Sequence, residues 1–242
     1  MVSEKPLNGK IILLTGASRG IGRAAAIACA NAGAELIITG RTTGALEEVD
    51  DEIQNAGSKA TIVELDSTDL PAIPRLAKAI HDKWGRLDGF IANAGQLGQM
   101  SPMPHIEADA WDQTILVNLT AVWHQIRSFD PLLRVSPAAR VVLMSSAAAV
   151  GPRPYWGAYA VSKAGVEAMG RAWAAENEQT EMKINMIDPG GTRTSMRAAA
   201  FPGEDPLSLP TPEDIAPAFV ALMRDDCPHH GELVKARSYI TS

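Results

Sequence analysis

Short apolar runs alternate along the chain with longer segments in which apolar residues recur every three to four positions. The runs are rich in Val, Ile and Leu and predict buried strands, whereas the longer segments predict amphipathic helices. We predict strands over residues 10–15, 35–39, 61–65, 87–92, 139–145 and 182–187. We predict helices over residues 21–32, 44–56, 70–84, 110–129 and 159–178. This alternation indicates an α/β fold, a doubly wound parallel sheet with helices on both faces.

One stretch, residues 197–211, follows neither period and contains three prolines and Gly203. A loop of that length inside a compact domain is more often a functional lid than a simple connection. We therefore expect a substrate lid at residues 195–212. No linker, repeat or low-complexity segment divides the rest of the chain, so the sequence predicts a single domain over residues 1–242.

Composition narrows the classes of protein. Apolar residues make up 46% and charged residues 21%, which is ordinary for a protein with a sizeable core, and the net charge is −6. An acidic chain of this kind has no electrostatic signature for nucleic acid or for an anionic membrane. It shows no apolar leader and no apolar run approaching about 18 residues, so we expect no signal peptide, no membrane span and a cytoplasmic location.

The two cysteines and five histidines lack the spacing of metal ligands or of a thiol catalyst, so no metal site is expected. Cys29 lies in an apolar helical run, which indicates a buried thiol. His229 and His230 are expected to be solvated.

A glycine-rich turn, TGASRGIG at residues 15–22, joins the first predicted strand to the first predicted helix. Glycine permits a tight turn and lets backbone N–H groups approach a pyrophosphate at the start of a helix. The GxxxGxG spacing differs from the commoner GxGxxG, and a glycine-rich turn alone is weak evidence. Its place between a strand and a helix favours dinucleotide binding through Gly16, Ser18, Arg19, Gly20, Ile21 and Gly22.

The second predicted strand ends at Gly40 and Arg41, where a site selective for NAD would usually place an acidic residue on the ribose 2′-hydroxyl. Arg41 and Arg19 could instead hold a 2′-phosphate by charge-assisted bonds, which favours NADP(H). The alternative is that Arg41 is a solvated loop residue and that Arg19 only fills a turn. Asp66, after the third strand, is placed either to meet the adenine edge or to form an ordinary Asx turn.

Tyr159 and Lys163 lie four residues apart on a predicted helix, so their side chains share one face. A free phenol titrates at about pH 10, too high for acid–base chemistry at neutral pH. An ammonium about 5 Å away would lower the pKa of Tyr159 by about two units, so that it could exchange a proton with a substrate. Taken alone, this spacing is common on helix surfaces and carries little weight.

Two further polar positions fall where a ligand should bind. Ser145 and Ser146 close the fifth predicted strand, and the Ser146 hydroxyl could hydrogen-bond a substrate carbonyl. A turn or helix-capping role is the alternative, which we assign to Ser145. Asn118 lies within an apolar helical run, and a buried Asn needs partners. It could hold a water molecule that leads to Lys163, or bridge backbone groups.

Together and in this order, the motifs resemble the short-chain dehydrogenase/reductase (SDR) family in its single-domain form, over nearly the whole chain. The resemblance rests on the turn at 15–22, Asp66, Ala92-Asn93-Ala94-Gly95, Asn118, Ser146, Tyr159, Lys163 and Pro189-Gly190. It implies a Rossmann fold that binds NAD(P)H and a catalytic tetrad of Asn118, Ser146, Tyr159 and Lys163. It also implies that Lys163 bonds the nicotinamide ribose, and that the cofactor is lined by Asn93, Ala94, Gly95, Ile187, Pro189, Gly190, Thr192 and Thr194.

Two stretches, residues 155–159 and 188–206, resemble a narrower bacterial branch, the YciK-like oxidoreductases. The family resemblance also implies a homo-oligomer, either a dimer or a tetramer. One segment departs from the family, because many members end their last strand in Asp-Gly-Gly, whereas this chain reads GELVKAR at residues 231–237. This departure counts against the usual C-terminal tetramer contact.

The sequence therefore predicts an NADP(H)-dependent oxidoreductase that interconverts the carbonyl and the alcohol of a small molecule. Leu97, Trp156 and Met196 suggest an apolar substrate pocket. Two alternatives stay open. One is a 3-oxoacyl-thioester reductase, in which Arg193 and Arg197 would face an acidic carrier protein. The other is a non-enzymatic dinucleotide-binding redox sensor.

Overall fold

The computed structural model of the protein describes residues 5–151 and 153–240. Its centre is a parallel seven-stranded sheet in the order β3-β2-β1-β4-β5-β6-β7. The strands are β1 (Ile11–Thr15), β2 (Glu35–Gly40), β3 (Ala60–Glu64), β4 (Gly89–Ala92), β5 (Arg140–Met144), β6 (Lys183–Asp188) and β7 (Leu233–Lys235). The strand order reverses between β1 and β4, where doubly wound sheets bind their ligands. The predicted fold is confirmed.

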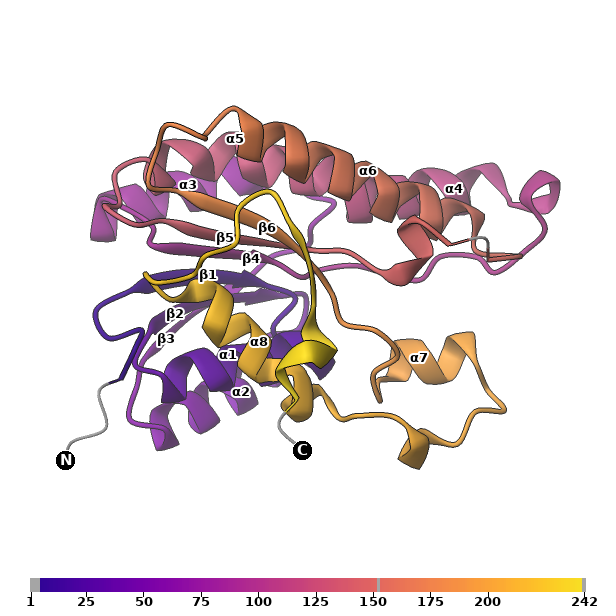
Figure 1. The fold of residues 1–242 in the computed structure, drawn as a ribbon, viewed down its shortest axis with the longest axis horizontal. Helices are drawn as coiled ribbons and strands as arrows, with labels where there is room; N and C mark the ends of the chain where they lie inside the picture. Colours follow the sequence, from indigo (N-terminus) through magenta and orange to yellow (C-terminus); the bar gives the residue numbers. More distant parts are fainter. Residues whose placement is uncertain (1–4, 152, 241–242) are drawn as a thin grey trace.

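Helices cover the two faces of the sheet as separate layers (Figure 1). One layer consists of α1 (Gly20–Asn31), α2 (Thr43–Asn55) and α8 (Pro212–Met223), and the other of α3 (Ala72–Trp84), α4 (Ala108–Ile115), α5 (Ala121–Leu133) and α6 (Gly157–Ala175). Successive side chains of β1 enter two different cores, since Ile12 and Leu14 pack with the first layer and Leu13 with the second. Burial on both faces explains why the strands read as continuous apolar runs.

The structure differs from the predicted elements in three places. The helix expected at residues 110–129 is divided into α4 and α5 by a π-helical turn, Leu116–Thr120. Helix α8 was not predicted, because it begins with Pro212 and contains Pro217. A proline at the first helical position needs no N–H partner. Pro212 was therefore the signal in the sequence that a helix begins at this position. Strand β7 was also missed, since it has only three residues.

The segment expected as a lid, residues 195–212, lies beyond the sheet near the ends of its strands (Figure 1). It is helical in part, as α7 (Ser195–Ala200). The Arg197 guanidinium donates to both carboxylate oxygens of Glu204, at 2.6 Å each, and lies 3.7 Å from the centroid of the Phe201 ring. The segment therefore holds its shape by contacts of its own.

Several side chains singled out by type have structural surroundings. Cys29 is buried as expected, and burial raises the pKa of its thiol to about 12. His229 and His230 are partly buried rather than solvated, because His229 pairs with Glu232 at 2.8 Å and His230 Nε2 lies 3.0 Å from the Ala174 carbonyl oxygen. In the described part of the chain, no group of acidic, His and Cys side chains could hold a metal ion, and no helix is long and apolar enough to cross a membrane.

Candidate active site

The glycine-rich turn between β1 and α1 closes tightly against the end of β4. Gly16 and Gly20 have φ angles of 70° and 55°, which glycine adopts readily. A side chain at Gly22 would overlap the carbonyl oxygen of Gly16, so this glycine allows the helix to pack against the turn. The Asn93 amide donates to the carbonyl oxygens of Thr15 and Gly16, both at 3.0 Å. The turn is thus fixed by β4, while the first N–H groups of α1 lack helical partners, as an anion site requires.

The segment after β4 links this turn to the side chains expected to do chemistry. The Thr15 hydroxyl accepts a hydrogen bond from the Asn93 backbone N–H at 3.1 Å. Two residues later, a Cβ atom on Gly95 would lie 3.2 Å from Asn118 Oδ1 and 3.7 Å from Lys163 Nζ. Residues 93–95 therefore border both parts of the site, and a side chain at Gly95 would crowd the second part.

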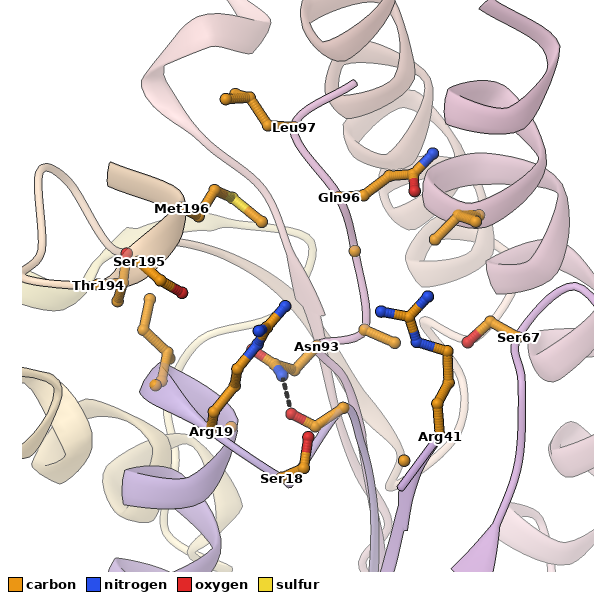
Figure 2. A pocket seen from close by; sticks show the side chains of 18 of the residues that line it. Ser18, Arg19, Arg41, Ser67, Asn93, Gln96, Leu97, Thr194, Ser195 and Met196 are labelled. Carbon is orange, nitrogen blue, oxygen red and sulfur yellow. Dashed lines mark hydrogen bonds between the residues drawn. The ribbon is translucent and has the colours of Figure 1, made fainter. Parts of the chain in front are cut away.

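A cavity of about 490 Å³ lies over the turn at the carboxyl ends of the strands. Arg19 and Arg41 extend into it from opposite sides, with Ser18 and Ser67 nearby (Figure 2). Ser67 and Gln96 line it without having been singled out from sequence; for Ser67 the available signal was its place directly after Asp66. The predicted cofactor residues that line the cavity are Gly16, Ser18, Arg19, Gly20, Ile21, Gly22, Arg41, Asp66, Asn93, Ala94, Gly95 and Thr194.

Asp66 fits both interpretations made from the sequence. Its Oδ1 atom accepts hydrogen bonds from the Thr68 backbone N–H and hydroxyl, both at 2.8 Å, which is an Asx turn. The Thr68 N–H is the main cause that lowers the pKa of the Asp66 carboxyl, and Arg41 adds a smaller electrostatic contribution. The same residue lines the cavity. The turn therefore fixes Asp66 at the edge of the space that a nucleotide would occupy.

A smaller cavity, of about 130 Å³, adjoins the first and shares several lining residues with it. Ser146 from the end of β5 and Tyr159 and Lys163 from α6 line it together. The predicted residues Pro189, Gly190, Thr192 and Thr194 line it as well. Side chains grouped from distant parts of the sequence thus meet at one cavity.

Lys163 is enclosed at the base of this cavity. It is 3% exposed, and its ammonium donates to the Met144 carbonyl oxygen at 2.8 Å. Nζ lies 5.7 Å from the centroid of the Tyr159 ring. Burial lowers the pKa of Lys163 from 10.5 to about 8, because a charged group is poorly solvated in the interior.

The pKa of Tyr159 departs from expectation. We expected Lys163 to lower it, and this is wrong for the structure described, in which the pKa of Tyr159 lies above its ordinary value of 10.0. Burial is the largest cause, a hydrogen bond with the Ser146 side chain opposes it, and the Asp188 carboxylate adds to it. The physical reason is that the Lys163 ammonium is directed to the Met144 carbonyl, whereas the phenol is buried.

The two serines that follow β5 have different environments. Ser146 Oγ accepts a hydrogen bond from the Ala148 N–H at 3.2 Å and so caps the short 3₁₀ turn Ala147–Ala149. The capping role assigned to Ser145 is therefore wrong. Neighbouring residues of an extended chain point to opposite sides, and Ser145 is buried, where its hydroxyl donates to Glu167 Oε1 at 2.6 Å.

Asn118 is fully buried in the π-helical turn. Its Oδ1 accepts from the Gln96 N–H at 2.8 Å, and its Nδ2 donates to the Gln96 carbonyl at 2.9 Å and to Ser162 Oγ at 3.1 Å. Of the two interpretations given above, these contacts favour the bridging of backbone groups. Asn118 thereby fixes the segment after β4 against α6.

Asp188, the last residue of β6, was considered only as part of a longer motif. Its Oδ1 accepts from the N–H groups of Ala147 at 3.1 Å and Gly190 at 3.0 Å, which joins the loops after β5 and β6. The Thr192 hydroxyl donates to the Pro189 carbonyl at 3.2 Å. A carboxylate at the end of a strand, directly before Pro-Gly, was the signal for this turn.

The smaller cavity has large apolar side chains in its wall, and Arg197 of the segment 195–212 lines it as well. Leu97, Trp156 and Met196 line it, as the sequence suggested. The Trp156 ring centroid lies 5.6 Å from that of Tyr159 and 5.7 Å from that of Phe201. An apolar group attached to a reacting carbon could pack against this wall.

Arg193 and Arg197 do not form the open basic surface expected for an acidic carrier protein. Arg193 donates to the carbonyl oxygens of Pro206 at 2.8 Å and Leu209 at 3.1 Å. Arg197 is held by Glu204. Both guanidinium groups are engaged by groups of residues 204–209, so the thioester alternative loses the support it drew from these two arginines.

Comparisons with known proteins agree with this description. The short chain dehydrogenase family profile matches residues 10–205. The chain is 41% identical to the oxidoreductase YciK of Escherichia coli K12 over 223 residues, which is 91% of this chain and 88% of that protein. It is also similar to crystal structures of short chain dehydrogenases from Shigella flexneri 2a, complexed with NADP, and from E. coli CFT073, complexed with NADPH. Each is 39% identical with a TM-score of 0.93, over 97% of this chain and 100% and 99% of theirs. The protein is thus an oxidoreductase of the short-chain dehydrogenase/reductase family.

Proposed function

We propose that the protein interconverts a carbonyl and an alcohol of a small molecule, using NADP(H). The observation that carries this proposal is the meeting of Ser146, Tyr159 and Lys163 at a small cavity that adjoins the larger cavity over the glycine-rich turn. The small cavity would receive the substrate and the larger one the dinucleotide. Bound NADPH supplies a hydride.

The larger cavity fits a phosphorylated dinucleotide. A Cβ atom on Gly16 would lie 2.8 Å from the Cα atom of Ala94, so glycine keeps this turn close to β4 and free of side chains. Arg19 and Arg41 would hold the 2′-phosphate, since guanidinium groups form strong charge-assisted bonds with phosphates. The crystallised relatives with NADP and NADPH support this choice of cofactor.

The residues in and beside the smaller cavity have separate roles in the proposed reaction. The Ser146 hydroxyl donates a hydrogen bond to the substrate carbonyl, and the Tyr159 phenol gives its proton to the same oxygen on reduction. Tyr159 is protonated at neutral pH and so has a proton to give, although its raised pKa makes it a weaker acid than a phenol in water. Lys163 holds the cofactor ribose, and Asn118 fixes the backbone of Gln96 beside the cavity.

Replacing Tyr159 by Phe tests this assignment. We expect kcat to fall by about 10²- to 10⁴-fold for any carbonyl that the wild type reduces, because the proton donor is lost. The affinity for NADPH should change little, since the phenyl ring remains. A panel of aldehydes, ketones and acyl thioesters, followed by NADPH absorbance, measures turnover, and NADPH fluorescence measures binding.

Tyr155→Phe is the matched control, because this neighbouring tyrosine is 58% exposed and its hydroxyl is not placed at the cavity. It should retain wild-type turnover. Turnover by Tyr159→Phe at the wild-type rate would contradict the proposed function.

A further inference from the structure

Helix α6 carries a buried carboxylate that the proposed chemistry does not use. Glu167 is 1% exposed and lies on the helix face of Tyr159 and Lys163, eight and four residues further along. A buried charge is unfavourable unless hydrogen bonds and opposite charges compensate for it. The partners of Glu167 therefore show why the fold tolerates it there.

Glu167 has two partners of different kinds. Oε1 accepts a hydrogen bond from Ser145 Oγ at 2.6 Å, and Oε2 accepts one from Arg171 at 2.6 Å. The Arg171 side chain is 51% exposed, so solvent can take over its role. Ser145 is 1% exposed and has no such replacement. The bond between Ser145 and Glu167 is thus an interior tie between the end of β5 and α6, which lies along the face of the sheet near β5 and β6 (Figure 1).

Ser145 stands between the two residues of this strand end that meet the reacting groups. The carbonyl of Met144, on one side, accepts from Lys163 at 2.8 Å. Ser146, on the other side, lines the cavity with Tyr159. The Ser145 backbone N–H is itself bonded to the Ile187 carbonyl of β6 at 2.8 Å. Tying Ser145 to α6 therefore fixes both neighbours relative to that helix.

We propose that Glu167 is a positioning residue for the reaction, acting through Ser145 to hold the end of β5 in register with α6. This proposal rests on the proposed function, because it assigns Glu167 to the alignment of Ser146 with Tyr159. Small displacements of reacting groups have large kinetic effects, and about 1 Å can change a rate about 100-fold. Glu167 touches neither substrate nor cofactor in this scheme, so its contribution is to alignment alone.

The molecule contains a matched pair at the opposite end of the sheet. Ser136 Oγ donates to the Asp88 carboxylate at 2.6 Å, and Asp88 is 5% exposed. This pair joins the segments that precede β4 and β5, far from both cavities along the strands. Ser136→Ala therefore removes a serine-to-carboxylate bond at the end of the strands opposite Ser146, and separates a loss of stability from a loss of alignment.

The test compares Glu167→Ala, Glu167→Gln and Ser145→Ala with Ser136→Ala, using NADPH and the best carbonyl of the panel. We expect Glu167→Ala and Ser145→Ala to lower kcat by about 10- to 100-fold, with KM and NADPH affinity within about threefold. Glu167→Gln keeps an oxygen that can accept from Ser145, so its kcat should recover to within about threefold of the wild type. The double variant that combines Ser145→Ala with Glu167→Ala should lower kcat no more than the more severe single variant does, since both changes break the same bond.

Retention of wild-type kcat by Ser145→Ala would overturn the proposal, as would a comparable loss of kcat in Ser136→Ala. Ser145→Ala removes a single hydroxyl and provides the decisive result if Glu167→Ala does not fold. In both of those outcomes the wild type still reduces carbonyls, so the proposed function stands. If the wild type binds NADPH but reduces no carbonyl in the panel, the proposed function itself is contradicted, and the positioning role with it.

Discussion

Polar side chains at the two ends of the parallel sheet have different surroundings. At the amino ends, Lys10 pairs with Asp225, and Asp88 accepts from the Ile11 N–H at 3.0 Å and from Ser136. Arg140, 4% exposed, donates to backbone carbonyls of Ala139, Glu181, Arg224 and Asp225. At the carboxyl ends, Arg19, Arg41, Ser146 and Tyr159 line cavities instead.

This contrast distinguishes two roles of buried polar groups, which are stabilisation of the fold and contact with a ligand. Groups at the amino ends satisfy one another, so they join strands to helices and contribute to stability. Groups at the carboxyl ends keep hydrogen-bonding capacity directed into a cavity, which costs stability and provides ligand contacts. The pair Ser145–Glu167 lies at the carboxyl ends, yet its two groups satisfy each other as Ser136 and Asp88 do, with the same bond length of 2.6 Å.

The largest expected effect is on the free energy of unfolding and comes from the burial of Lys163. Its pKa is lowered from 10.5 to about 8, so between these values the unfolded chain binds more protons than the folded protein. Stability should therefore rise with pH in this window, by on the order of 3 kcal/mol in all. Lys163→Met removes this dependence. Urea unfolding of both proteins from about pH 7.5 to pH 9.5 measures their free energies of unfolding. That of the wild type should increase relative to that of Lys163→Met as the pH rises, and a difference that stays constant with pH would contradict this prediction.

Asp88→Ala tests the amino ends. It leaves the Ile11 N–H, Ser136 Oγ and Arg86 without their carboxylate, and we expect a loss of about 2 to 3 kcal/mol in the free energy of unfolding. The kcat of the folded fraction should be unchanged, because no cavity is affected. Asp82→Ala, at an exposed ion pair with Lys78, should leave the free energy of unfolding nearly unchanged. A fall in kcat for Asp88→Ala would show that the two ends are coupled.

Arg41→Ala tests the larger cavity. Loss of one charge-assisted phosphate contact should weaken NADPH binding by about 10- to 100-fold while leaving NADH binding within about twofold. Fluorescence titration with both nucleotides measures the ratio. Arg75→Ala, an exposed arginine paired with Asp69, is the control. An unchanged ratio for Arg41→Ala would exclude it as the phosphate-binding residue.

The sequence predicted the fold and the grouping of site residues well, because both follow from local signals. Apolar runs mark β1 and β5, and glycines mark the turn before α1. Parallel strands bring their ends to one edge, so Ser146 could be placed at the ligand-binding edge of the sheet, while its grouping with Tyr159 followed from the resemblance to the SDR family.

What the sequence missed depends on side-chain direction and on burial. Ser145 and Ser146 are the same residue type, so the sequence does not distinguish them. The side of the chain to which each one points decides which of the two caps a turn. The pKa of Tyr159 follows from how deeply the phenol is buried and where the Lys163 ammonium is directed, which spacing along a helix does not reveal. Helix α8 was hidden by Pro217, since proline disfavours a helix interior, although Phe219 and Leu222 of this helix pack in the core.

The smallest expected effect concerns the segment proposed as a lid at residues 195–212. Glu204→Gln removes the charge that holds Arg197 and so loosens the contact of Arg197 with Phe201. Because Phe201 packs beside Trp156 at the apolar wall, the KM for the carbonyl substrate should rise by about three- to tenfold, with kcat and NADPH affinity within about twofold. Steady-state kinetics with the carbonyl varied at saturating NADPH gives both constants.

Glu213→Gln is the control for this change, since Glu213 is exposed in the first turn of α8 and pairs with Arg23 at 3.6 Å. It should leave KM unchanged. If Glu204→Gln also leaves KM unchanged, the segment does not act on substrate binding through this ion pair. If instead it lowers NADPH affinity as strongly as Arg41→Ala, the segment belongs to the larger cavity, where Ser195 and Met196 already line the wall. A selective change in KM would place it over the smaller cavity, as a substrate lid requires.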